Sequence, residues 1–178
     1  MQDNLERQLV DAAAAGDIES FGELCGRYYG PMVAIAYSVL SDHQLAEDAA
    51  QESFARALVN VTRLKNRARF APWLAAICRN VARDMVAVKA RRIDAADIAQ
   101  AAPQSGQDEN GMLIRRAIER LPAAARESIV LRYYNNMSYE EIASVSGISR
   151  AAVNGRLARA KRKMAKYLKR NGFPESRL

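Results

Sequence analysis

Apolar residues recur along almost the whole chain at the three- and four-residue spacing of amphipathic helices. No stretch of useful length shows the two-residue alternation that is typical of a strand. A first helix is expected to begin near Leu5 and to end at Gly16. Asp17 then begins a second helix, whose broad apolar face continues to Leu40. The pattern therefore predicts an all-α protein.

Two more amphipathic stretches complete the first half of the chain. One runs from Gln44 to about Val61 and carries acidic and amide side chains at spacings that can share one exposed face. The other follows the basic segment TRLKNRARFAP (residues 62–72) and has an apolar stripe from Trp73 to Val88. The ring of Trp73 has two interpretations, because it can anchor the core or stack on an unpaired base.

The character of the chain changes in residues 93–112. This segment is rich in Ala, Asp and Gln, contains Pro103 and lacks a coherent apolar face, so it predicts a flexible acidic linker. Helical periodicity then resumes, with Pro122 in the first turn of one of the helices. We therefore expect two small helical domains joined by a flexible linker.

Residues 137–166 are the most informative stretch of the chain. Ser138 and Glu141 have the spacing of a capping box, which predicts a helix start at this point. Gly147 can adopt the positive φ that ends a helix, and Ser149 can cap a second one. This spacing is typical of a helix-turn-helix, whose second helix enters the DNA major groove.

The formal net charge of +7 is the sum of unlike blocks. Residues 1–62 carry 3 basic and 10 acidic side chains, residues 63–92 carry 9 and 1, and residues 149–178 carry 10 and 1. A block in which nearly all charged side chains are positive can neutralise phosphates. Two such blocks therefore predict two separate contacts with nucleic acid. The acidic lobe suits a basic protein partner, although an acidic helix face can also serve solubility alone.

The residue types that build metal and catalytic sites are scarce. Cys25 and Cys78 are the only cysteines and His43 is the only histidine, so no cluster has metal-ligand spacing and no catalytic constellation can be assembled. Both cysteines lie in apolar helical contexts and are expected to be buried and reduced. No signal peptide and no apolar run of about 18 residues is present. We therefore expect a cytoplasmic protein that is not an enzyme, with no cofactor, no metal, no small-molecule substrate and no direct membrane insertion.

Four segments in register resemble the extracytoplasmic-function (ECF) group of bacterial RNA polymerase sigma factors. They read AGD...F..L, LAEDAAQESFARA, FAPWLAAICRNVARD and LPAAARESIVLRYYNNMSYEEIASVSGISRAAV. The resemblance implies a sigma region-two domain over residues 1–92 and a region-four helix-turn-helix domain over residues 113–172, with the linker at 93–112.

The resemblance also implies a function. An alternative sigma factor binds core RNA polymerase, recognises two promoter elements and initiates transcription, without catalysing a reaction itself. The partners implied are the clamp helices of the largest polymerase subunit, the flap region, promoter DNA and a sequestering anti-sigma factor.

The family motifs assign three sets of contact residues. Contact with the polymerase clamp helices falls to Asp48, Gln51 and Glu52. The pocket for a flipped base of the minus-ten element is framed by Leu64, Lys65, Asn66 and Arg67, and the same DNA strand runs along Asn80, Arg83 and Asp84. The bases of the minus-thirty-five element face Asn154, Gly155, Ala158 and Arg159, while its phosphates contact Ser149, Arg150, Arg156 and Arg162.

An ordinary helix-turn-helix regulator is the alternative. In that case the N-terminal half would serve dimerisation or sensing, and the protein would bind a palindromic DNA site without polymerase. The sequence offers no ligand-pocket signature for such a role, and the second basic block would then have no purpose.

Overall fold

A computed structural model describes residues 2–95 and 109–173 of the chain. Over these residues the protein consists of eight α-helices and two short 3-10 helices, without a strand, which confirms the all-α prediction. The helices are α1 (Gln2–Ala14), α2 (Ile18–Leu40), α3 (His43–Asn60), η1 (Val61–Arg63), η2 (Arg67–Arg69), α4 (Phe70–Ala95), α5 (Glu109–Glu119), α6 (Ala123–Tyr133), α7 (Tyr139–Ser146) and α8 (Arg150–Arg170).

The expected linker lies mostly outside the described residues. The parts of it that the structure does describe, residues 93–95 and 109–112, belong to the end of α4 and the start of α5.

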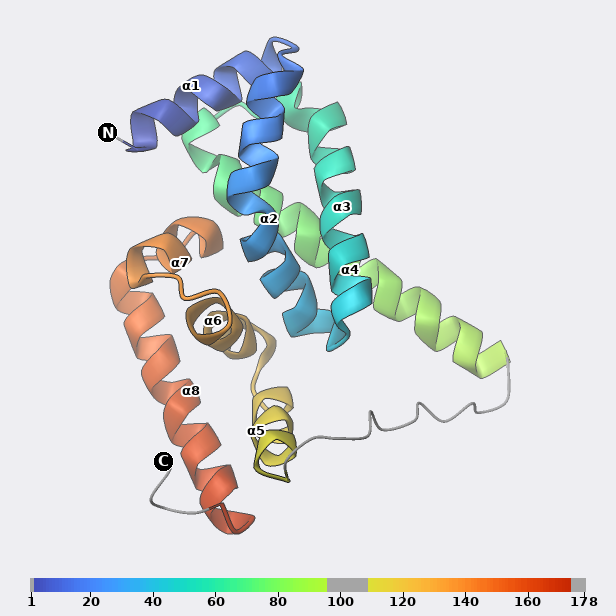
Figure 1. Cartoon of the computed structure of the whole chain (residues 1–178), viewed down its shortest axis with the longest axis vertical. Helices are drawn as coiled ribbons and strands as arrows, with labels where there is room; N and C mark the ends of the chain where they lie inside the picture. The colour runs from blue at the N-terminus through green and yellow to red at the C-terminus, as the bar shows by residue number, and fades with distance from the viewer. Residues whose placement is uncertain (1, 96–108, 174–178) are drawn as a thin grey trace.

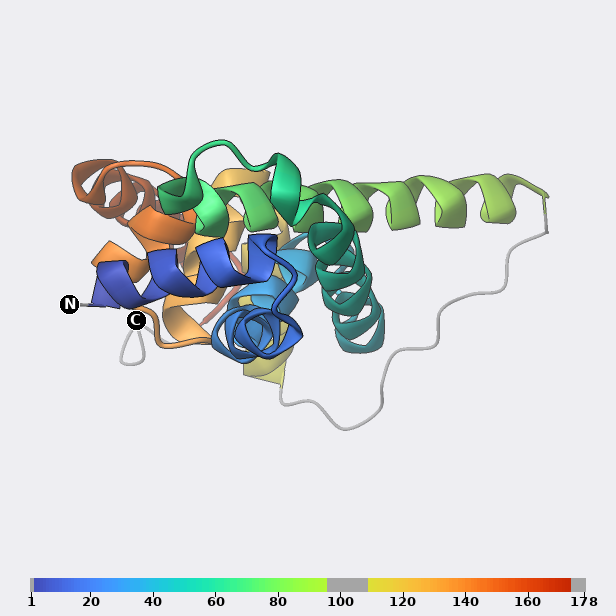
Figure 2. The ribbon, with the colours of Figure 1, turned by 90° about the horizontal axis from the view of Figure 1, so that it is seen from above.

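The first domain is formed by α1 to α4 (Figure 1). Asp17 caps α2 by accepting a hydrogen bond from the Glu19 amide at 3.1 Å, and Asp42 caps α3 in the same way through the Leu45 amide at 3.1 Å. The side chains that fill this core include Leu24, Met32, Ile35, Phe70 and Leu74, each completely buried. Viewed from above, the outer half of α4 extends well beyond the other helices (Figure 2).

The second domain is formed by α5 to α8, and its helix-turn-helix follows the sequence prediction. Both bonds of the capping box are present: Ser138 Oγ accepts from the Glu141 amide at 3.2 Å, and Glu141 Oε2 accepts from the Ser138 amide at 2.7 Å. Gly147 has φ of 68° and ends α7, and Ser149 caps α8 through the Ala152 amide at 3.2 Å. The two helices bury Ile142, Val153 and Leu157.

The two domains pack directly on each other, with α2 against α6 and α4 against α7 (Figure 1). One continuous buried cluster includes Met32 and Leu74 of the first domain together with Leu131 and Ile142 of the second. The sequence indicated two domains but contained no signal for how they dock.

Candidate protein and nucleic-acid interfaces

The acidic face of α3 is open to solvent. Asp48, Gln51 and Glu52 are all exposed, and their spacing places them on one side of the helix, while Phe54 points into the core with 8% of its surface exposed. Glu52 Oε1 accepts a hydrogen bond from Arg56 Nε at 2.7 Å. The three residues assigned to polymerase contact thus form one accessible acidic surface.

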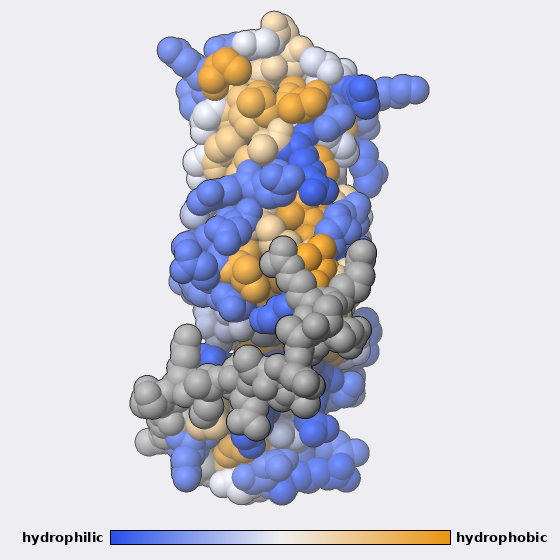
Figure 3. Space-filling model, turned by 90° about the vertical axis from the view of Figure 1, so that its right-hand side faces the viewer, coloured by the Kyte–Doolittle hydropathy of each residue, from blue (hydrophilic) through white to orange (hydrophobic). Residues whose placement is uncertain are grey.

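Apolar side chains continue this surface toward the end of α3. Leu58 is 39% and Val59 is 76% exposed, next to the acidic residues on the same helix. On the side of the molecule toward which α4 extends, apolar patches alternate with hydrophilic bands (Figure 3). An acidic surface with apolar neighbours suits a protein partner better than it suits DNA.

The loop before α4 is shaped by Arg67. Its Nη1 donates to the carbonyl oxygens of Val61 at 2.8 Å and Leu64 at 2.5 Å, and its Nε pairs with Asp11 Oδ1 at 3.2 Å. Arg67 therefore closes the loop and ties it to α1. Lys65 is exposed and is not drawn into this network.

Next to this loop, a shallow groove of about 330 Å³ separates the end of α3 from the first half of α4. Its walls are formed by Arg56, Asn60, Arg63, Trp73, Ile77 and Asn80. Such a groove offers an aromatic face together with guanidinium and amide donors, which is the chemistry that holds an unpaired base and its phosphates.

The position of Trp73 is compatible with both interpretations of its ring. Phe70 is the core anchor with none of its surface exposed, and the half-buried Trp73 packs against it with ring centroids 5.8 Å apart while also lining the groove. Of the groove residues, the family motifs named only Asn80. The motifs did not indicate that Arg56, Asn60 and Arg63 also line this groove, and only their spacing of three and four residues at the end of α3 and in η1 could have done so.

Along α4, the residues assigned to the DNA strand interact with each other and with α3. Arg83 Nη1 donates to Asn80 Oδ1 at 3.3 Å. Asp84 Oδ2 lies 3.6 Å from Arg56 Nη1, so Arg56 connects Glu52 on α3 with Asp84 on α4. Apart from these contacts with one another, the side chains of Asn80, Arg83 and Asp84 are exposed to solvent.

Helix α8, the second helix of the helix-turn-helix, carries the third predicted set of residues. Gly155 and Arg156 are partly buried, and the exposed members are Ser149, Arg150, Asn154, Ala158, Arg159 and Arg162. Arg150 Nε pairs with Glu140 Oε1 at 2.6 Å. A Cβ at position 155 would lie 3.3 Å from Arg159 Nη1, so Gly155 leaves room for that guanidinium at the expense of about 1 kcal/mol of helix propensity.

The two cysteines differ in their surroundings. Cys78 is completely buried, its Sγ lies 3.3 Å from the Met32 carbonyl oxygen, and burial raises its thiol pKa to about 11. Cys25 is only partly buried, which corrects the expectation that both are interior, and desolvation also raises the pKa of its thiol. The described residues contain no group of His, Cys, Asp and Glu that could hold a metal ion. Among the described helices, none is long and apolar enough to span a membrane.

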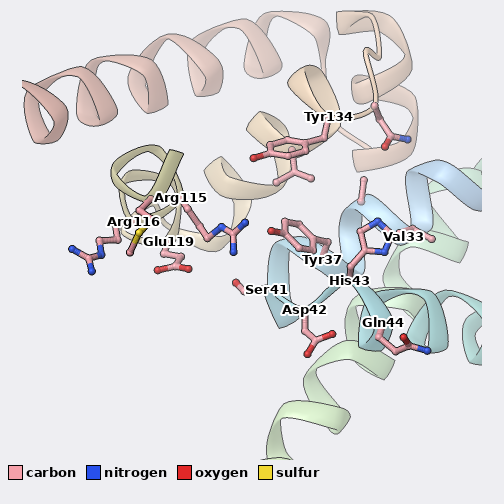
Figure 4. Close-up of a pocket in the computed structure, with 14 residues that line it drawn as sticks. Val33, Tyr37, Ser41, Asp42, His43, Gln44, Arg115, Arg116, Glu119 and Tyr134 are labelled. Carbon is pink, nitrogen blue, oxygen red and sulfur yellow. The ribbon is translucent and has the colours of Figure 1, made fainter. Parts of the chain in front are cut away.

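A cleft of about 900 Å³ lies between the two domains. In Figure 4, Tyr37 of α2 and Tyr134, which follows α6, face each other across its end, and Arg115 of α5 points toward Tyr37. The two tyrosine ring centroids are 6.2 Å apart. The cleft belongs to the docking of the domains rather than to the groove beside α4 or the exposed face of α8.

Comparison with protein-family models finds two matches in this chain. Residues 24–92 match the model described as Sigma-70 region 2, and residues 111–164 match the model described as Sigma-70, region 4. The first match contains α3, the loop and the groove-forming part of α4, and the second contains the helix-turn-helix.

Two curated relatives illustrate the similarity. CarQ of Myxococcus xanthus, an RNA polymerase sigma factor, is 30% identical over 159 residues, which cover 86% of this chain and 91% of CarQ. RfaY of Xanthomonas campestris pv. campestris, named a probable RNA polymerase sigma factor, is 35% identical over 161 residues, 84% of this chain. The chain spans only 40% of the length of RfaY.

Solved structures share the fold. The structure of CnrH in complex with the cytosolic domain of CnrY matches with a TM-score of 0.62 and 26% identity, over 94% of this chain and 99% of that one. The sigma factor RpoE in complex with the anti-sigma factor NepR from Bartonella quintana matches with a TM-score of 0.58 and 24% identity, over 85% and 98% of the two chains, a likeness of fold.

Proposed function

The chain belongs to the RNA polymerase sigma factor family, within its extracytoplasmic-function group, and from this premise we propose how its surfaces divide the work of promoter recognition. The family consists of transcription initiation factors and not of known enzymes. In our proposal α3 binds core polymerase, α4 and its loop bind the melted minus-ten element, and α8 reads the minus-thirty-five element as a duplex. The cytoplasm, where bacterial transcription takes place, is the compartment that this role implies.

The observation that supports this proposal most directly is that the two surfaces suited to DNA lie on different domains and differ in chemistry. The surface on α8 is a convex helix with exposed cations and a capped N-terminus, which suits the major groove of a duplex. The surface on α4 is a groove with an indole wall, which suits an unstacked base. A protein with both can bind a duplex and hold a melted strand.

For the duplex element, we assign base contacts to Asn154, Gly155, Ala158 and Arg159. A guanidinium can bind a guanine through two hydrogen bonds, so Arg159 is the residue we expect to discriminate bases most strongly. Phosphate contacts from Ser149, Arg150, Arg156 and Arg162 would set the register of the helix in the groove.

For the melted element, the proposal assigns the strand to the groove and the loop beside it. Asn80 offers an amide to a base edge, Trp73 offers its ring face, and Lys65 and Arg83 are exposed cations for phosphates. Arg67 would act through the shape of the loop, since its guanidinium is occupied by Val61, Leu64 and Asp11. Capture of unstacked bases in this way favours strand opening.

Protein partners complete the proposal. We assign the clamp helices of the largest polymerase subunit to the surface formed by Asp48, Gln51 and Glu52, and the flap region to the second domain. Because CnrH and the RpoE of Bartonella quintana each have a structure in complex with another protein, in the second case an anti-sigma factor, we also propose control by an anti-sigma factor.

Run-off transcription tests this function. Purified core polymerase would be incubated with a pool of genomic promoter fragments, with and without the protein. We expect transcripts that appear only when the protein is present. If core polymerase neither binds the protein nor starts at new sites, while the protein alone shifts duplex DNA, it is a stand-alone helix-turn-helix regulator instead.

A further inference from the structure

A hollow lined by four cations lies at the far end of the second domain, between α5 and the C-terminal half of α8. Its volume is about 480 Å³, and its lining consists of Ala117, Arg120, Lys163, Lys166, Tyr167 and Arg170. None of these six residues is acidic. None of the residues that we assign to the promoter or to the clamp helices lines this hollow, so its chemistry has no use in the proposed function.

The hollow is built by two helices that are fixed against each other. Ala117 of α5 packs with Leu168 of α8 and with Phe173 in a small buried cluster, so α5 is held beside the C-terminal half of α8 (Figure 1). Tyr167 is half-buried against the same cluster. The guanidinium carbon of Arg120 lies 5.0 Å from the centroid of the Tyr167 ring, a cation–π contact. The ring thus holds the cation of α5 next to the cations of α8.

The charges of the hollow are not balanced by acids. Within the part of the chain that the structure describes, the four cations take part in no ion pair, and all four side chains are exposed. Lys163, Lys166 and Arg170 are three and four residues apart on α8, a spacing at which like charges repel each other. A solvated helix face usually mixes both signs, whereas cations that converge on a hollow attract an anion that relieves their repulsion.

The hollow continues the side of α8 that carries Arg159. Arg159, Lys163, Lys166 and Arg170 follow each other at spacings of four, three and four residues, which places them in one stripe along the helix. At a rise of about 1.5 Å per residue, Lys166 lies about 10 Å and Arg170 about 16 Å further along the axis than Arg159. The cations of the hollow therefore share a face with the residue to which we assign base recognition.

These separations match the width of the major groove. In B-form DNA the groove is about 12 Å wide, and the phosphates of both strands border it. When Arg159 is placed at the base edges, cations about 10–16 Å further along the same stripe reach the border of the groove, where the phosphates lie. Ser149 and Arg150, to which we assign phosphate contacts, lie at the opposite end of α8. Contacts at both ends would fix the helix across the groove.

We propose that Arg120, Lys163, Lys166 and Arg170 form a distal basic site that binds phosphates of the DNA backbone next to the bases that Arg159 reads. Arg120 joins the contact from α5, so two helices hold the DNA. The site adds affinity for every sequence alike, because phosphates carry no sequence information. The inference rests on the proposed function only for the choice of the minus-thirty-five element, whereas binding of duplex DNA by the site concerns the protein alone.

Titrations of duplex DNA at several salt concentrations test the site on the full-length protein without polymerase. Each phosphate contact contributes about 0.9 to the slope of log affinity against log salt. We expect the triple variant Arg120→Gln, Lys166→Gln and Arg170→Gln to reduce this slope by about 2.7. The charge-retaining variant Arg120→Lys, Lys166→Arg and Arg170→Lys should keep most of the slope, which separates the loss of charge from misfolding.

The matched control compares two single substitutions on α8. Lys166→Gln should reduce the slope by about 0.9. Lys161→Gln removes the same charge from another side of the helix, where Lys161 Nζ lies 5.8 Å from the centroid of the Tyr133 ring, and should leave the slope nearly unchanged. Equal slopes for wild type and the triple variant, with helicity intact in both, would overturn the site. So would the absence of duplex binding by the wild type at low salt.

Neutral methylphosphonate linkages then locate the contacted phosphates on a promoter bound by holoenzyme. We expect single linkages beside the minus-thirty-five element to weaken the wild type and to have no effect on the triple variant. If the triple variant keeps the salt slope but forms less holoenzyme, the site binds an acidic protein surface and the DNA assignment is wrong. If the wild type directs no transcription by core polymerase, the sigma role fails, whereas a reduced slope in the triple variant still establishes the phosphate site.

Discussion

The cations of the two surfaces that we assign to DNA are used differently. On the loop and α4, Arg67 and Arg83 donate to atoms of the protein itself. On α8, Arg150 pairs with Glu140, whereas no ion pair with an acid forms at Arg156, Arg159 or Arg162 within the part of the chain that the structure describes. Both stretches look equally basic in the sequence.

This difference shows what each surface needs. We infer that a groove for an unstacked base has to be held in shape, which fits the contacts of Arg56 with Glu52 and Asp84 and those of Arg67 with two carbonyl oxygens and Asp11. A helix that enters a preformed major groove already has its shape from the backbone, so its cations can remain available for phosphates and bases. Substitutions on the first surface should therefore affect stability, and those on the second should affect DNA binding.

The largest effect is expected for Arg67→Ala. Loss of two charge-assisted hydrogen bonds and the pair with Asp11 should lower the free energy of unfolding by about 3 kcal/mol. Urea denaturation of wild type and variant measures this difference in the free energy of unfolding. Lys65→Ala, in the same loop but exposed, is the control and should stay within about 0.5 kcal/mol of wild type. Equal stability of the two variants would show that Arg67 does not shape the loop.

Arg159→Ala should weaken DNA binding and leave stability unchanged. Its unfolding free energy should stay within about 0.5 kcal/mol of wild type, while holoenzyme affinity for a promoter with the preferred upstream base should fall by about 1–3 kcal/mol, or roughly 5- to 150-fold. Competition binding with promoters that differ at single upstream base pairs measures this.

The matched control for Arg159 is Lys163→Ala, one turn further along the same helix. It should preserve the preference among upstream bases. If Arg159→Ala weakens every promoter by the same factor, the residue contacts phosphate and not a base.

Ser138→Ala should destabilise the helix-turn-helix by about 1 kcal/mol, through loss of the α7 cap. The contribution of this capping box to stability should depend on pH. Hydrogen bonds from the Ser138 backbone amide and side chain lower the pKa of Glu141 in the folded protein, so this contribution is present above the ordinary glutamate pKa of about 4.3. This contribution to stability is lost as the pH falls through the lowered pKa of Glu141 in the folded protein.

Thermal unfolding of wild type and Glu141→Gln between pH 3 and pH 7 measures the pH dependence. The stability difference should shrink toward acid. A constant difference over the whole range would show that the carboxylate charge plays no part in the cap.

The smallest effect is expected for Arg162→Ala. Removal of one phosphate contact should weaken DNA binding a few-fold for all sequences alike and reduce the slope of log affinity against log salt by about 1. Titrations at several salt concentrations measure the slope. An unchanged slope would place Arg162 away from the DNA backbone.

Local features of the fold could be predicted from the sequence, because they depend on neighbours in the chain. Backbone geometry is specified within a few residues by the Ser138–Glu141 capping box, by Gly147 and by Ser149. The structure has all of these features. The same is true of Asp17 as the cap of α2. Family motifs could add roles to single positions such as Asn80.

Contacts between distant segments could not be predicted. Arg79 has the same sequence context as the solvent-facing arginines of α4, and only tertiary packing makes it a partner of Glu127. Nothing in the sequence singled out Arg56, yet it joins Glu52 to Asp84 and lines the groove. Cys25 was expected in the interior because its neighbours are apolar, but α2 turns it partly outward.

The central claim is that one domain reads a duplex while the other holds a melted strand. The most direct test combines nuclease footprinting and permanganate reactivity of unpaired thymines on one promoter, using holoenzyme assembled with wild type, Asn80→Ala or Arg159→Ala. Asn80→Ala should keep the upstream footprint and lose most of the thymine reactivity. Arg159→Ala should weaken the upstream footprint first. If both variants lose footprint and reactivity to the same degree, the division of work between the two domains is wrong.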